Sequence, residues 1–374
     1  MSVKQKLLFF FLFCICFLFT AHPVLAQQIP SATAKPEFMK AQVVQILGVK
    51  KNPYSDYHST IQALDVTILD GASAGQTVQV NYDSQNISDL ALNVGDTIIL
   101  EKAVNASGNT TYSIEDKYRL DSISFIAAAF IILVILIAGW KGFASFIGLG
   151  LSLLVIFSYI VPQILAGADP LTICLIGSII ILLLTTYIAH GFSKQTTIAL
   201  CATLLALFIT FLLSLLIAQI SQITGYADEN DIAIHFGTQH LINVKGLLLG
   251  SIIIGTLGAL NDITTTQAAA IFEFAKTDKQ LTAKHLFKKG FAVGREHIAS
   301  LINTLVLAYA GSALTVFLFL FYNSSYYPLW VILNGETLNE EVIRTIVGTA
   351  GLLCVVPIVT FLASYFATKP HKSV

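Results

Sequence analysis

Long apolar runs separated by short polar stretches occupy the chain from residue 121 to its end. Each run approaches the roughly 20 residues with which an α-helix crosses a hydrocarbon core of about 30 Å. The pattern therefore predicts an all-α helical membrane bundle. We expect about seven transmembrane helices, at residues 123–140, 143–162, 170–190, 197–220, 246–272, 298–322 and 343–366.

A different pattern precedes these runs, because apolar and polar residues alternate between residues 35 and 120. Leu64, Val66 and Ile68 alternate with polar neighbours, and glycine-containing turns separate this run from similar ones. Alternation with a period of two is typical of half-buried strands. About five short strands predict a small all-β domain, an OB-like or SH3-like barrel. We therefore expect a β domain at residues 27–120 and a membrane domain at residues 121–374.

Residues 1–26 have the order of parts of a secretory signal. Two lysines precede the apolar run 7–19, and His22-Pro23 and a small residue at Ala26 follow it. The run is short for a membrane span. A cleaved signal peptide and a retained N-terminal anchor are both compatible with this pattern, and either one places the β domain outside the cytoplasm.

Composition narrows the class of protein. Hydrophobic residues make up 55% and charged residues 11% of the 374 residues, against about 25% charged residues in ordinary soluble domains. The formal net charge of −1 gives no attraction to anionic polymers. We therefore expect the lipid bilayer as a partner, no nucleic acid and no conventional soluble enzyme. None of the cysteines lies between Gln27 and Leu120, so a disulfide framework is excluded there.

Basic residues orient the predicted spans, because cytoplasmic loops are enriched in lysine and arginine. With the β domain outside and an odd number of spans, the C-terminus is expected in the cytoplasm. The predicted outer loops between the spans hold only Lys245 and Arg344, both at span edges. The predicted inner side carries Lys141, Lys194, Lys276, Lys279, Lys284, Lys288, Lys289, Arg295, Lys369 and Lys372.

The fifth predicted span is unusually long and unusually polar. Residues 246–274 would form a straight helix of about 43 Å, which exceeds the hydrocarbon core. One interpretation is a continuous, tilted helix that protrudes into the cytoplasm. The other is a helix broken near residues 258–262, whose freed backbone groups line a cavity. The polar run in its second half is Asn261-Asp262-Ile263-Thr264-Thr265-Thr266-Gln267.

Asp262 is the only acidic residue well inside an apolar run. A charge at membrane depth costs about 2.5–3.5 kcal/mol on insertion scales, so such a residue usually faces the bundle interior and serves a function. Its carboxylate can bind a cation or take up a proton. The alternative is a structural aspartate near the inner interface that caps a helix or pairs with a cytoplasmic base.

The sixth predicted span carries a polar face. Glu296, Ser300, Asn303 and Leu307 follow one another at steps of four, three and four, which places them on one side of a helix. Our hypothesis is that the fifth and sixth spans pack together and that Asp262 and Asn303 face one cavity. The candidate ion or solute site is Asn261, Asp262, Thr265, Asn303 and Thr304, and the candidate inner-mouth residues are Glu273, Arg295 and Glu296.

Enzyme chemistry finds little support in the sequence. It contains no HExxH, GxSxG or P-loop motif and no second deep acid for an aspartyl intramembrane protease. We therefore predict no catalytic residues and no cofactor. His235 and His240 lie near acidic residues, but their separation is not the same-face i, i+4 spacing, so a zinc or manganese site there is the less favoured interpretation.

Two polar segments resemble the signature of YibE/F-like bacterial membrane proteins. The first runs from Gly255 through Asp262 to Glu273, and the second is Gly294-Arg295-Glu296-His297 followed by 303–305 and 307–311. The resemblance covers about residues 121–368. It implies an N-terminal span or signal, a small extracytoplasmic domain and a multi-span region in a bacterial cell membrane, but no substrate. The family pattern leads us to expect a proline soon after the Gly-Ser of the sixth span, but this chain has Leu314-Thr315 there. Whether the helix kinks at this point therefore stays an open question.

Two functions from different classes follow. The leading hypothesis is a permease or secondary transporter for an ion or small solute, based on Asp262, the long fifth span and the polar patches. The alternative is a non-transporting scaffold or stress-protection factor that binds a partner through the β domain. A protein partner or a homo-oligomer is compatible with both.

Overall fold

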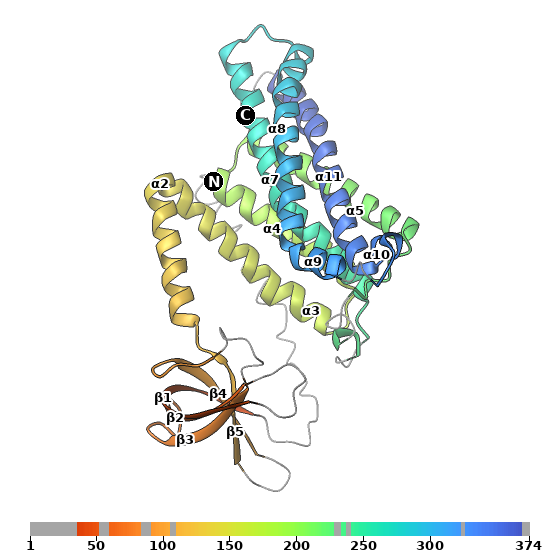
Figure 1. Cartoon of the computed structure of the whole chain (residues 1–374). Helices are drawn as coiled ribbons and strands as arrows, with labels where there is room; N and C mark the ends of the chain where they lie inside the picture. Colours follow the sequence, from red (N-terminus) through yellow and green to blue (C-terminus); the bar gives the residue numbers. More distant parts are fainter. Residues whose placement is uncertain are drawn as a thin grey trace. The chain divides into compact units, whose positions relative to one another are not determined.

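The computed structural model describes residues 36–51, 60–83, 91–104, 110–227, 233–236, 241–322 and 326–368, so the predicted signal segment lies outside the described residues. The chain divides into two compact units (Figure 1). One unit contains the β-strands and continues to Ile137, and the other begins at Ala138. The boundary lies inside the first long helix.

Five antiparallel strands form the sheet of the first unit in the order β3-β2-β1-β4-β5. β3 also contacts β5, so the sheet curls into a half-barrel, which confirms the predicted small β domain. Its core contains Leu64, Val66 and Ile68, each at most 1% exposed. The strands are β1 (Glu37–Lys51), β2 (Thr60–Ile68), β3 (Thr77–Asp83), β4 (Thr97–Val104) and β5 (Thr110–Lys117).

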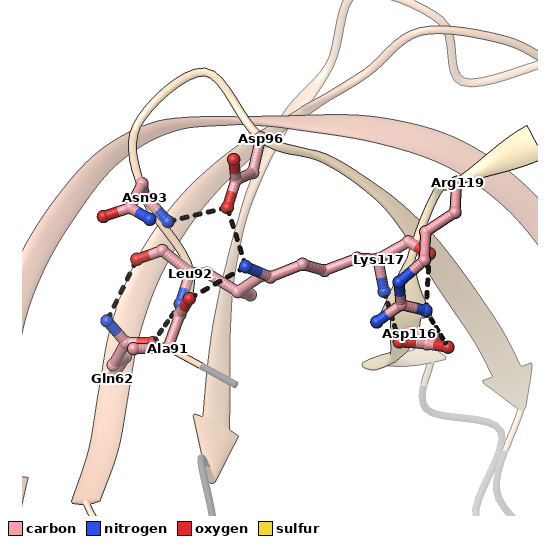
Figure 2. Close-up of polar contacts among 8 residues, drawn as sticks. All are labelled: Gln62, Ala91, Leu92, Asn93, Asp96, Asp116, Lys117 and Arg119. Atoms are coloured by element: carbon pink, nitrogen blue, oxygen red, sulfur yellow. Dashed lines mark hydrogen bonds and ion pairs between the residues drawn. The ribbon is translucent and has the colours of Figure 1, made fainter. Parts of the chain in front are cut away.

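A buried glutamine on β2 fixes the segment that precedes β4 (Figure 2). The backbone N–H of Leu92 donates to Gln62 Oε1 at 2.9 Å, and Gln62 Nε2 donates to the Leu92 carbonyl at 3.2 Å. Lys117 Nζ on β5 donates to the Ala91 carbonyl at 3.0 Å and pairs with Asp96 at 3.3 Å. Together these contacts hold Leu92 in the core of the half-barrel, where it is 1% exposed.

The segment between β5 and the first helix is tied to the same sheet. The Tyr118 N–H donates to the Thr97 carbonyl at 2.9 Å, and the Lys40 ammonium lies 4.1 Å from the centre of the Tyr118 ring. The Arg119 guanidinium lies 2.6 Å from Asp116 and, together with a backbone N–H, lowers the pKa of that carboxyl below its usual value. The exit from the sheet is therefore an ordered part of the half-barrel.

Helices make up the rest of the described chain. The described residues include six helices long and apolar enough to cross a membrane, or seven if one bent pair counts as a span. This confirms the predicted multi-span membrane bundle. The elements are α2 (Leu120–Val155), the π-helical turn η2 (Ile156–Ile160), α3 (Val161–Leu165), α4 (Pro170–His190), α5 (Lys194–Ile220), α7 (Val244–Thr277), α8 (Ala283–Ser312), α9 (Leu314–Tyr322), α10 (Leu329–Leu333) and α11 (Glu336–Ala367).

Breaks interrupt two long helical segments, and the first lies where the sequence separates the predicted spans 123–140 and 143–162. Gly139 has φ 59° and ψ −142°, so α2 consists of two spans, Leu120–Trp140 and the segment that begins at Gly142. α8 and α9 meet at Ala313 with a bend of 58°. A kink therefore exists in the sixth predicted span although no proline is present there.

α7 is one continuous helix of 34 residues, so the interpretation with a break near residues 258–262 is wrong. It contacts α4, α5, α8 and α11, which makes it the central helix of the membrane unit. Ile253 and Leu260 of α7 are fully buried and belong to one apolar core with Leu182, Leu207 and Val355. The face of α7 that meets other helices can carry polar residues that lipid would not tolerate. The opposite face is an exposed stripe of Ser251, Gly255, Gly258, Asp262 and Thr266.

Candidate binding site

Three residues in the polar run of α7 bond to different neighbouring helices. Thr186 Oγ1 of α4 donates to Asn261 Oδ1 at 2.9 Å. The hydroxyls of Thr264 and Thr203 of α5 lie 2.6 Å apart, and both residues are fully buried. These polar residues therefore hold helices together, as hydrogen bonds between membrane helices do.

Gln267 extends the same role to two more helices. Its Nε2 donates to the Gly290 carbonyl of α8 at 2.6 Å and to Thr360 Oγ1 of α11 at 2.9 Å. Gln267 is 2% exposed, so both bonds are shielded from water. The hydroxyl of Thr265 instead donates to the carbonyls of Asn261 and Asp262 within α7.

Asp262 is exposed and, together with Asn261, lines an open cavity of about 500 Å³. Its carboxylate makes no hydrogen bond to any residue that the structure describes, whereas the imidazole of His190 influences it electrostatically. α2, α4 and α7 surround the cavity. Its polar and small lining residues are Ser145, Gly148, Ser152, Thr185, His190, Gly258, Asn261 and Asp262.

A second cavity of about 240 Å³ adjoins the first at His190, which lines both. Gln195 and Thr196 of α5 line it together with Thr265 and Thr266 of α7. Polar groups therefore continue from Asp262 toward the end of the bundle at which α4 ends and α5 begins. In the opposite direction the first cavity ends among apolar side chains such as Ile156 and Ile254.

The structure brings together only part of the predicted site. Asn261 and Asp262 line the larger cavity and Thr265 lines the smaller one, but Asn303 and Thr304 line neither. Both of these α8 residues are exposed. α8 does pack against α7, through Gly290 and Gly294 rather than through the polar face.

The predicted inner-mouth residues also lie apart from the cavity. Glu273 forms an exposed ion pair with Lys276 at 2.6 Å on the last turns of α7. Arg295 and Glu296 are exposed on α8. His235 Nδ1 donates to the Ile242 carbonyl at 2.8 Å, and its predicted companion His240 lies outside the described residues.

Sequence reasoning missed the contribution of α4 and of the second half of α2. Thr185 and His190 are visible near the end of the third span, yet periodicity does not reveal that they line a cavity with Asp262. Ser145 and Ser152 are ordinary small residues in an apolar run. Only the packing of three helices turns them into the lining of one cavity.

Comparison with known proteins identifies a family and no activity. A family model described as YibE/F-like protein matches residues 126–369, which is well over half of the chain. No curated protein and no solved structure matches the chain.

Proposed function

The chain belongs to the YibE/F-like family of membrane proteins, and from this premise we propose that it is a permease-like protein for an ion or small solute. The proposed binding site is the carboxylate of Asp262 in the cavity between α2, α4 and α7. A carboxylate favours a cation or a proton as the transported species. Asn261 and Thr265 are the proposed neighbours in the site. Neither a catalytic step nor a resident cofactor is part of this proposal.

One observation carries the proposal: an aspartate inside a candidate span opens into a polar cavity, and no described residue hydrogen-bonds to its carboxylate. A carboxylate used only for structure would be capped or paired, as Glu336 is by the N–H groups of Thr224 and Gly225 at 2.6 and 2.7 Å. Because an unpaired charge at this depth costs several kcal/mol, its presence there favours a ligand or a proton that neutralises it.

The position of the polar groups supports an access route from one end of the bundle. The two cavities meet at His190, near the end at which Lys194 Nζ donates to the Phe366 carbonyl at 2.6 Å. We propose that this end is cytoplasmic, that the half-barrel is extracytoplasmic, and that residues 1–26 are a signal peptide or anchor. The protein would then bind its ion from the cytoplasmic side in this conformation.

A thermal-shift measurement on the detergent-purified full chain tests the site. The probes are protons over a pH series, Na⁺, K⁺, Mg²⁺, Mn²⁺ and Zn²⁺, applied to the wild type and to Asp262→Asn. A cation at 100 times its dissociation constant should add about 2.7 kcal/mol of stability to the wild type. Asp262→Asn should remove this gain while the protein remains folded, because the side chain keeps its shape and loses its charge.

Asp278→Asn is the matched control, since Asp278 lies in the exposed connection after α7 and its carboxylate accepts a backbone N–H from Gln280 at 3.0 Å. This variant should respond to every probe as the wild type does. If no probe stabilises the wild type, or if Asp262→Asn responds equally, the proposed site is wrong.

The hydrogen bonds from Asn261, Thr264 and Gln267 to four neighbouring helices favour a second candidate function, a non-transporting scaffold. In this alternative the polar run only stabilises the bundle, and the half-barrel binds a partner. Removing residues 35–115 would then abolish function, whereas Asp262→Asn would leave it unchanged. The permease predicts a loss with Asp262→Asn.

A further inference from the structure

α8 has two faces of opposite character. Leu286, Gly290 and Gly294 are buried, and farther along the helix Leu301 and Leu305 pack against the bundle core. The opposite face is exposed along its length. Its residues are Glu296, Ala299, Ser300, Asn303, Leu307 and Gly311.

The exposed face lies at membrane depth. A Cβ placed on Gly294 would lie 3.0 Å from Gln267 Nε2 of α7 and against Val356 of α11. A Cβ on Gly255 of α7 would lie 3.6 Å from the hydroxyl of Tyr309. Residues 294–309 of α8 therefore run beside the middle of α7, which is itself a candidate span.

Lipid cannot satisfy the polar groups of this face. The side chains of Arg295, Glu296 and Asn303 make no hydrogen bond or ion pair within the described chain, whereas Thr304 donates to the Ser300 carbonyl at 3.0 Å. An unsatisfied amide or charged group in hydrocarbon costs several kcal/mol. Another polar surface must therefore cover the face in the membrane.

The first span of the same chain does not provide such a surface. Its residues from Phe125 to Gly139 include no side chain with a hydrogen-bonding group. A second copy of the chain does provide one, because two copies inserted in the same direction can pair α8 with α8 about an axis along the membrane normal.

We propose that this face of α8 is the interface between two copies of the chain. Arg295 and Glu296 are adjacent, so parallel pairing brings the guanidinium of one copy to the carboxylate of the other at the same height. Asn303 can pair with its own counterpart, since a carboxamide both donates and accepts. The small side chains at Ala299, Ser300 and Gly311 allow the backbones of two helices to approach closely. The proposal is independent of transport at Asp262.

Disulfide crosslinking of the full chain in native membranes tests the interface. Asn303→Cys, in a chain whose own cysteines are replaced by alanine, should form a covalent dimer with copper phenanthroline as the oxidant. Leu205→Cys is the control, because Leu205 is a half-exposed residue of α5, another candidate span, at 50% exposure. Equal crosslinking at both positions would mean random collision and would overturn the proposal.

Charge exchange gives a second readout that does not depend on cysteine chemistry. Glu296→Arg and Arg295→Glu should each weaken dimerisation about tenfold, measured by single-molecule photobleaching in liposomes. The double variant Arg295→Glu/Glu296→Arg should restore it. Three results would contradict the proposal: no restoration, a crosslink from Asn303→Cys to Ile132→Cys of the same chain, or a crosslink only to a different protein.

Discussion

Asp262 and Gln267 lie five residues apart on α7, yet their surroundings differ. Gln267 uses both N–H groups of its amide in bonds to α8 and α11 and is 2% exposed. Asp262 has a cavity in front of its carboxylate instead of a neighbouring helix. A polar residue inside a span is therefore structural or functional according to what it meets, and its chemical type alone does not decide.

Replacement of Gln267 tests the structural role at this scale. Gln267→Ala removes two interhelical hydrogen bonds and leaves a small void, so we expect a loss of about 1–3 kcal/mol in the free energy of unfolding. The measurement is the unfolding midpoint of the purified protein in detergent. Gln219→Ala is the control, because Gln219 is exposed near the end of α5 and its replacement should leave the midpoint unchanged.

At the scale of elements, close approach of α4 and α7 depends on a glycine. A Cβ placed on Gly250 would lie 2.6 Å from Cys174 Sγ and 2.9 Å from Cys174 Cβ, so one of the two helices would have to move. Gly258 lies two turns farther along α7 and meets nothing within 4 Å. The two glycines therefore have different effects: Gly250 allows α4 and α7 to pack closely, and Gly258 leaves the cavity open.

Alanine at these two positions separates the effects of packing and helix propensity. Both substitutions gain about 1 kcal/mol of helix propensity. Gly250→Ala should nevertheless destabilise the protein, since overpacking costs about 1–3 kcal/mol. Gly258→Ala should leave stability unchanged or raise it. Equal midpoints of thermal unfolding for the two variants would show that α4 and α7 are not packed as closely as described.

The sequence predicted these elements well where periodicity carries the information. The half-barrel strands follow from alternation, as in Leu64, Val66 and Ile68, and the spans follow from length. The sequence left the bend at Ala313 open, because no proline follows the Gly311-Ser312 pair and small residues also serve straight helix packing. Likewise, spacing placed Glu296 and Asn303 on one face of α8, but spacing does not determine whether a face points toward the bundle or away from it. That direction depends on contacts between distant segments, here through Gly290 and Gly294.

At the scale of the whole molecule, contacts between helix ends decide the number of crossings. Lys194 at the start of α5 bonds to Phe366 at the end of α11, so these two ends lie on one side of the membrane. Glu336 at the start of α11 bonds to Thr224 just after α5, so these ends lie on the other side. α7 returns the chain to the first side, and the bent pair α8–α9 must therefore cross once. This argument favours seven spans over six.

Labelling of single cysteines with a membrane-impermeant maleimide tests this count and the orientation together. The positions are Thr110 on β5, Lys279 between α7 and α8, and Thr368 after α11, all exposed or partly exposed. With an extracytoplasmic half-barrel and seven spans, Thr110→Cys should react in intact cells, and the other two only after permeabilisation. If Thr368→Cys reacts in intact cells while Lys279→Cys does not, α8–α9 re-enters without crossing. If Lys279→Cys reacts and Thr110→Cys does not, the orientation is reversed, and the proposed route to Asp262 would open on the extracytoplasmic side.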